Sequence, residues 1–238
     1  MFNLELRKID PSKREVSKHE TYYGLLQKLI RDYHITYVFD VGASHGNWAA
    51  GLISESITAN IISFEPLNDS YKELKKRTDV HDNWECENYA LGEADETALI
   101  NVSESPECSS IKNITSTHLE AFPLSNVTEK QNVSVKSLDS FLDQRHDVNG
   151  NIFLKIDVQG HEKDVFDGCK KSLNRISLLQ LEISLSTMYE NELLLTEWLG
   201  LLEEYKFYPL HFQNAFSHLK SNRLLQLDCI FFNGNLSN

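Results

Sequence analysis

The chain has 238 residues, of which 41% are hydrophobic and 24% are charged, and these proportions are typical of a globular protein. The net charge of -12 would repel a nucleic-acid backbone, and no long basic cluster offsets it, so we expect no nucleic-acid partner. The four cysteines, Cys86, Cys108, Cys169 and Cys229, are scattered without a Cys-x-x-Cys pair, which argues against a zinc knuckle or a redox motif.

The N-terminal part, residues 1–36, is predicted to be a capping segment of one domain that spans residues 1–238. Its first 20 residues are polar, and no run of the chain approaches the roughly 20 apolar residues that a membrane span needs. We therefore expect a cytoplasmic protein without a membrane span. Apolar residues recur at helical spacing over residues 21–33, which predicts a helix before the first strand.

Apolar runs then alternate with helical patterns along the chain. We expect strands at residues 37–41, 61–64, 84–92, 152–158 and 178–183. Helices are expected at residues 47–56, 67–77 and 161–173. Strands that alternate with helices predict an α/β fold, in which helices cover both faces of a parallel sheet.

Two regions modify this pattern. Residues 93–150 are long for one connection, and we interpret them as an insertion near the ligand, with strands at 98–102 and 133–135 and a helix at 138–144. The C-terminal part predicts a helix over 192–205 and strands near 208–212 and 225–232. The connection between these last two strands has no helical pattern, so they are expected to be antiparallel neighbours.

Polar or small residues follow each predicted strand of the sheet. In a parallel sheet, ligands bind beyond the carboxyl ends of the strands. These strand ends carry Asp40, Gly42, Ala43, Ser44 and Gly46, then Glu65 and Pro66, then Asn88 and Ala90, then Asp157, and finally Glu182. We expect them to form the rim of a ligand site.

The glycine turn after the first strand suits two classes of cofactor. Gly42 and Gly46 are separated by three residues, and the third glycine of a dinucleotide fingerprint is missing. S-adenosylmethionine carries an ammonium group and a ribose diol, which the carboxylates of Asp40 and Glu65 can bind. Glu65 alone would also suit the ribose of NAD, so a nicotinamide-dependent oxidoreductase and a non-catalytic cofactor-binding module remain alternatives.

Seven short blocks of sequence lie between residues 38 and 184. They are VFDVGASHGNWA, ISFEP, NYALG, CSSI, VKSLDSFL, FLKIDVQGHEKDVFDG and LLQLEIS. Their order resembles that of the FkbM family of S-adenosylmethionine-dependent methyltransferases. The resemblance implies a Rossmann-like class I methyltransferase fold, with a seven-stranded, mostly parallel sheet and an antiparallel last strand. It also implies methylation of a hydroxyl oxygen on a sugar, glycolipid or small metabolite. By this resemblance, Asp40, Gly42 and Gly46 surround the methionine part of the cofactor, Glu65 binds the ribose and residues 88–90 border the adenine.

Asp157 and His161 are the candidate catalytic residues. A hydroxyl becomes a good nucleophile only when its proton is removed or shared, and both residues follow the fourth strand. His161 departs from the alanine or aromatic residue that is more usual in the family at this position. A metal held by Asp157 and Glu182 is the weaker alternative, so no metal is expected, and His45 and His211 are other candidates for the base. The sequence does not indicate an oligomeric state.

Overall fold

A seven-stranded sheet forms the centre of the computed structural model, which describes residues 21–218 and 220–236. The strand order is β3-β2-β1-β7-β8-β10-β9. These strands are β1 Ile35–Val41, β2 Asn60–Phe64, β3 Trp84–Glu87, β7 Asn151–Ile156, β8 Ile176–Ser184, β9 Phe207–Ser217 and β10 Leu224–Asn233. β10 runs antiparallel to both β8 and β9, and the other pairs are parallel. The predicted α/β fold with an antiparallel last strand is confirmed.

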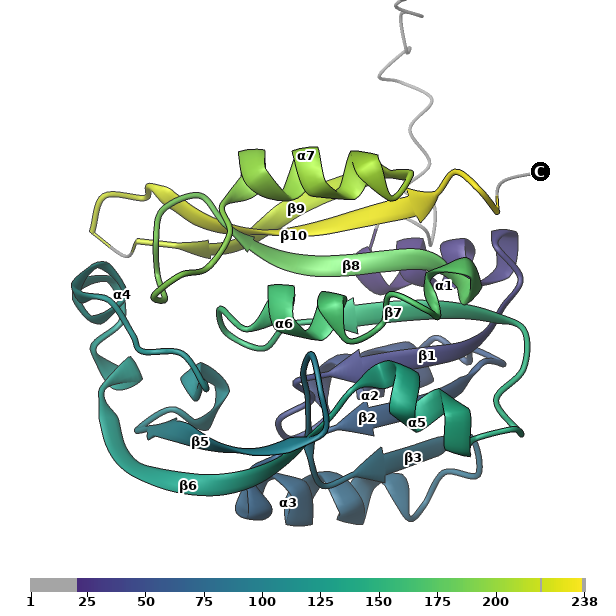
Figure 1. Ribbon diagram of the computed structural model, residues 1–238, viewed down its shortest axis with the longest axis horizontal. Coiled ribbons are helices and arrows are strands. Elements are labelled where there is room, and N and C mark those ends of the chain that lie inside the picture. Colours follow the sequence, from purple (N-terminus) through teal and green to yellow (C-terminus); the bar gives the residue numbers. More distant parts are fainter. Residues whose placement is uncertain (1–20, 219, 237–238) are drawn as a thin grey trace, which may run out of the picture.

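Helices cover both faces of the large sheet (Figure 1). The helices are α1 Tyr22–Asp32, α2 Asn47–Ser54 and α3 Asn68–Thr78 on one face, and α5 Leu138–Gln144, α6 Glu162–Asp167 and α7 Leu195–Glu204 on the other. Successive strand side chains point to opposite faces, so Val38 packs in the first layer and Phe39 in the second. The first 20 residues of the predicted capping segment lie outside the described residues.

A second sheet of three strands lies beside the carboxyl ends of β1, β2 and β7 (Figure 1). It consists of β4 Ala90–Leu91, β5 Glu96–Ser103 and β6 Val127–Lys136. The connection from β5 to β6 contains α4 Ser116–Ala121 and the 3-10 turns η3 Pro106–Cys108 and η4 Pro123–Ser125. A third such turn, η5 Leu173–Arg175, precedes β8.

Two sequence-based expectations about these elements are wrong. The single strand expected over 84–92 is divided, because the chain leaves the large sheet at Glu87 and Ala90–Leu91 pair with β6 instead. The helix expected over 161–173 ends at Asp167. At Gly168 a Cβ atom would lie 1.9 Å from the carbonyl oxygen of Gly92, so α6 ends where it meets the start of the second sheet.

Candidate functional site

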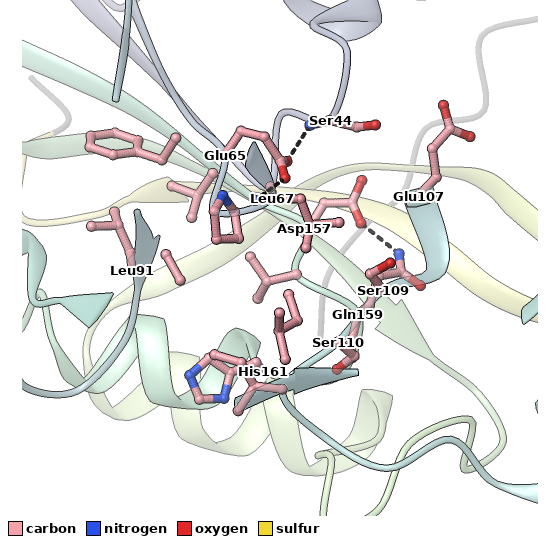
Figure 2. Close-up of a pocket in the computed structure, with 18 of the residues that line it drawn as sticks. Ser44, Glu65, Leu67, Leu91, Glu107, Ser109, Ser110, Asp157, Gln159 and His161 are labelled. Atoms are coloured by element: carbon pink, nitrogen blue, oxygen red, sulfur yellow. Dashed lines mark hydrogen bonds between the residues drawn. The ribbon is translucent and has the colours of Figure 1, made fainter. Parts of the chain in front are cut away.

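A cavity lies between the carboxyl ends of the parallel strands and the second sheet. The predicted rim residues that line it are Gly42, Ser44, Glu65, Pro66, Ala90 and Asp157. The second sheet and its loops add Leu91, Ile100, Ser109, Ser110 and Ile111 (Figure 2). We refer to this space as the first cavity.

Glu65 is fixed at the edge of the first cavity by two backbone N–H groups. The amide of Ser44 donates to its Oε2 at 2.8 Å, and the amide of Leu67 donates to its Oε1 at 2.8 Å (Figure 2). The residue is 5% exposed, and burial raises the pKa of its carboxyl to about 7, although the two N–H donors act in the opposite direction. The carboxyl therefore has a set orientation and titrates near neutral pH.

The glycine turn after β1 permits close packing at two different places. Gly42 has φ +77°, and a Cβ there would lie 1.9 Å from the carbonyl oxygen of Asp157. Gly46 has φ +79°, but a Cβ there would meet Leu74 and Trp84 at 2.7 and 2.9 Å. Gly42 thus brings the ends of β1 and β7 together at the cavity, whereas Gly46 serves the packing beneath α2.

Lys155 forms a buried ion-pair group with two of the predicted site residues. Its Nζ lies 3.0 Å from Oδ1 of Asp40 and 3.3 Å from Oδ2 of Asp157. Burial lowers the pKa of Lys155, but the two carboxylates outweigh burial and raise it above its usual value. Asp40 is fully buried and does not line the cavity, so its predicted contact with a cofactor stays a prediction.

A side-chain amide that the sequence analysis did not single out connects two carboxyl groups at the site. Gln159 donates from Nε2 to Asp157 Oδ1 at 2.9 Å and to Glu182 Oε2 at 3.0 Å. The hydroxyl of Tyr189 donates to Gln159 Oε1 at 2.5 Å, which sets the orientation of the amide. Gln159 has φ +58°, a conformation that non-glycine residues adopt rarely. The sequence feature that could have identified Gln159 as a site residue is its position directly after the fourth predicted strand.

A second, larger cavity adjoins the first. Gly42, Ser44, Glu107, Asp157 and Gln159 line both cavities. The residues that line only the second cavity are Ala43, Asn47, Trp48, Cys108, His118, Phe122, Lys155, Glu182, Ala215, Phe216 and Gln226. They come from the loop after β1 and from α2, β7, β8, the β5–β6 connection and the β9–β10 hairpin. Sequence reasoning missed His118, which lies in the long insertion.

Two other predicted site residues, Asn88 and His161, do not share the position of Glu65 and Asp157: Asn88 does not line the first cavity, and His161 lines it at another place. Asn88 donates from Nδ2 to the backbone oxygens of Glu65 and Pro66 at 2.9 and 3.2 Å, so it supports the turn that carries Glu65. His161 lines the first cavity, apart from Glu65 and Asp157 in Figure 2, and its Nδ1 lies 3.1 Å from Oδ2 of Asp164. A catalytic role for His161 therefore stays a prediction.

Within the described ranges, 21–218 and 220–236, His, Cys, Asp and Glu side chains form no group of three or more that could bind a metal ion. The helices of these ranges are too short or too polar to cross a membrane.

Burial and the nearby carboxylates of Asp157 and Asp228 raise the pKa of Glu182 well above its usual value.

The profile of one protein family, described as the methyltransferase FkbM domain, matches residues 40–209. A comparison with curated proteins finds no match. Mycoplasma capricolum TrmK, solved in complex with S-adenosyl-homocysteine, its natural cofactor product, is 10% identical with a TM-score of 0.50, over 89% of this chain and 67% of TrmK. This likeness shows a shared fold.

Two other solved structures are similar at lower TM-scores. Methyltransferase FkbM from Methylobacillus flagellatus is 14% identical with a TM-score of 0.49, over 82% of this chain and 43% of that chain. TehB from Haemophilus influenzae is 8% identical with a TM-score of 0.48, over 88% of this chain and 62% of that chain. The chain thus spans less than two thirds of the length of either structure.

Lys155→Met tests the buried ion-pair group. We expect the substitution to lower the free energy of unfolding by about 3–5 kcal/mol, because the fully buried Asp40 would keep its charge without its ammonium partner. Adding Asp40→Asn should restore part of that loss. The control is Lys72→Met, which breaks the exposed pair with Asp69 and should leave the free energy of unfolding nearly unchanged. Urea unfolding measures all of these variants, and equal losses for Lys155→Met and Lys72→Met would contradict the prediction.

Proposed function

The chain belongs to the FkbM methyltransferase family, and on that premise we propose that it transfers a methyl group from S-adenosylmethionine to a hydroxyl oxygen of a small or carbohydrate-like acceptor. The observation that carries this proposal is the charge of the first cavity. Its ionisable lining residues are Glu65, Glu107, Asp157 and His161, and none of the described lysine and arginine residues lines it.

This charge suits S-adenosylmethionine better than a dinucleotide. The pyrophosphate of NAD would face carboxylates without a cationic partner, which is unfavourable in a partly buried site. The ribose diol of S-adenosylmethionine can donate hydrogen bonds to Glu65, whose carboxyl already accepts from the amides of Ser44 and Leu67. The cationic methionine end fits the side of the cavity that carries Asp157.

Asp157 is the proposed catalytic residue because it lines both cavities. The cofactor supplies an electrophilic methyl carbon on a sulfonium. As the acceptor oxygen forms its bond to this carbon, the carbon–sulfur bond breaks and its electron pair stays on sulfur. Asp157 accepts the proton of the hydroxyl, and Gln159 and Lys155 hold its carboxylate in position.

We also propose that nucleic acid is not the acceptor and that the enzyme works in the cytoplasm. The net charge of -12 and the carboxylates of both cavities support an acceptor without a phosphate backbone. A screen of tritiated methyl transfer into sugars, glycolipid precursors, macrolides and unfractionated tRNA tests the acceptor class. Transfer into tRNA alone would overturn the small-acceptor proposal.

Titration with S-adenosylhomocysteine at several pH values tests the cofactor site. The pKa of Glu65 in the free protein is about 7, and the ribose diol needs the ionised carboxylate. Below this pKa a proton must leave on binding, so affinity rises as pH rises. We expect the dissociation constant to be about tenfold higher at pH 6 than at pH 8.

Glu65→Gln is the matched variant for this titration. It removes the titrating group, so affinity at pH 8 should fall about tenfold or more and should no longer change between pH 6 and pH 8. Thermal unfolding checks that the variant is folded. Tight binding of NAD without binding of S-adenosylhomocysteine would favour an oxidoreductase. Binding without turnover on any acceptor would favour a non-catalytic module.

Asp157→Asn tests the proposed base. The amide cannot take the proton of the acceptor, so turnover at saturating S-adenosylmethionine should fall about 10²-fold. His161→Ala in the same assay tests the second predicted catalytic residue, and EDTA tests the metal alternative. Normal turnover by Asp157→Asn would place the base elsewhere. Loss of wild-type activity in EDTA would favour a metal-assisted mechanism.

A further inference from the structure

The walls of the second cavity carry an unusual balance of hydrogen-bonding groups. Asp157, Glu107 and Glu182 contribute carboxyl groups. Among the described residues that line it, the one ammonium belongs to Lys155, which is already paired with Asp40 and Asp157. A negative group that enters this cavity would find no unpaired cation among these residues.

Two of the three side-chain amides of the wall, those of Gln159 and Gln226, are also engaged as donors, whereas Asn47 accepts from Arg77 through Oδ1 at 2.9 Å. Gln159 donates to Asp157 and Glu182, as described above. Gln226 donates from Nε2 to Glu182 Oε2 at 2.9 Å. The three carboxyl groups therefore dominate the polar wall, and a ligand that satisfies them must itself carry donors. The indole Nε1 of Trp48, which is buried without a hydrogen-bond partner among the described residues, is a donor of the same wall.

His118 adds an imidazole ring from α4, which in its neutral form carries one donor and one acceptor nitrogen. The residue is 3% exposed, its Nδ1 is buried without a hydrogen-bond partner among the described residues, and it lines the second cavity. Its ring packs against Tyr189 and Phe216, with centroids 5.0 and 6.1 Å apart. Burial lowers the pKa of His118 to about 4, so the imidazole is neutral at pH 7 and one ring nitrogen can accept a hydrogen bond.

Aromatic side chains supply the remaining apolar wall. Trp48 comes from α2, Phe122 follows α4, and Phe216 lies on β9. Aromatic rings favour contact with the apolar faces of a ring-shaped ligand and attract cations to their own faces. The preference for cations agrees with the carboxyl groups of the wall.

We propose that the second cavity binds the methyl acceptor, that this acceptor is a neutral or cationic ring alcohol without phosphate or carboxylate, and that His118 accepts a hydrogen bond from a donor of the acceptor other than the reacting hydroxyl. This inference rests on the proposed function. Asp157 receives the reacting hydroxyl, and His118 fixes the opposite part of the molecule. His118 is therefore a specificity residue, distinct from the proposed base.

Three ring alcohols of equal size test the charge preference on protein saturated with S-adenosylhomocysteine. The probes are trans-4-aminocyclohexanol, trans-1,4-cyclohexanediol and trans-4-hydroxycyclohexanecarboxylate. Trp84 and Trp198 are 3% and 2% exposed, so Trp48 is the tryptophan whose fluorescence should report binding in the second cavity. We expect the amine to bind at least as tightly as the diol, and both to bind about tenfold or more tightly than the carboxylate.

His118→Phe tests the specificity residue. Phenylalanine keeps the packing against Tyr189 and Phe216 but removes both ring nitrogens, so the amine and the diol should bind about tenfold more weakly. His118→Gln retains a side-chain acceptor and should recover most of this loss. His146→Phe, at an exposed histidine outside both cavities, is the matched control and should bind all probes as the wild type does.

Affinity for S-adenosylhomocysteine should be the same in all of these variants, which separates this proposal from the proposed function. Failure of the wild type to bind S-adenosylhomocysteine would overturn the proposed function and this inference with it. With S-adenosylhomocysteine bound, three results would overturn this inference alone. They are carboxylate binding as tight as that of the amine, no response of Trp48 to the amine or the diol at millimolar concentration, and unchanged probe affinity in His118→Phe.

Discussion

The buried ammonium of Lys155 is the interaction on which the site depends. Asp40 and Lys155 are register partners on the adjacent parallel strands β1 and β7, and Lys155 also reaches Asp157 at the end of β7. Burying these charges is favourable only while the group stays complete, because removal of one partner leaves an uncompensated charge. The pairing thus fixes the two strand ends from which the glycine turn and the Asp157 loop begin.

Each cavity contains a carboxyl group whose position follows from that arrangement. Gly42 lets the turn after β1 approach the backbone of Asp157, and the same turn presents the amide of Ser44 to Glu65. Asp157 lies where the two cavities meet, and Gln159 connects it to Glu182 in the second cavity. A cofactor in the first cavity and an acceptor in the second would therefore meet beside one carboxylate. Direct methyl transfer requires that the methyl carbon and the acceptor oxygen lie next to each other.

Local sequence patterns predicted the parts of the site that follow directly from strands. The apolar runs before Asp40 and Glu65 identified both strand ends, and Glu65 lies at the cavity as expected. Asp40 pairs with Lys155 in the structure, and its predicted contact with a cofactor stays a prediction. Local pattern could not show this pair, because the two residues are more than 100 positions apart in the sequence. His118 and Gln159 could not be assigned from local pattern. His118 reaches the second cavity only because β5 and β6 pair around its loop, and Gln159 is oriented by the distant Tyr189.

The most direct test of this account is a crystal structure of the protein with S-adenosylhomocysteine bound. The account predicts adenosine in the first cavity, both ribose hydroxyls within hydrogen-bond distance of Glu65, and the sulfur beside Asp157 at the opening to the second cavity. Clear density for the ligand outside the first cavity, or with its ribose away from Glu65, would contradict the proposed arrangement of cofactor and acceptor.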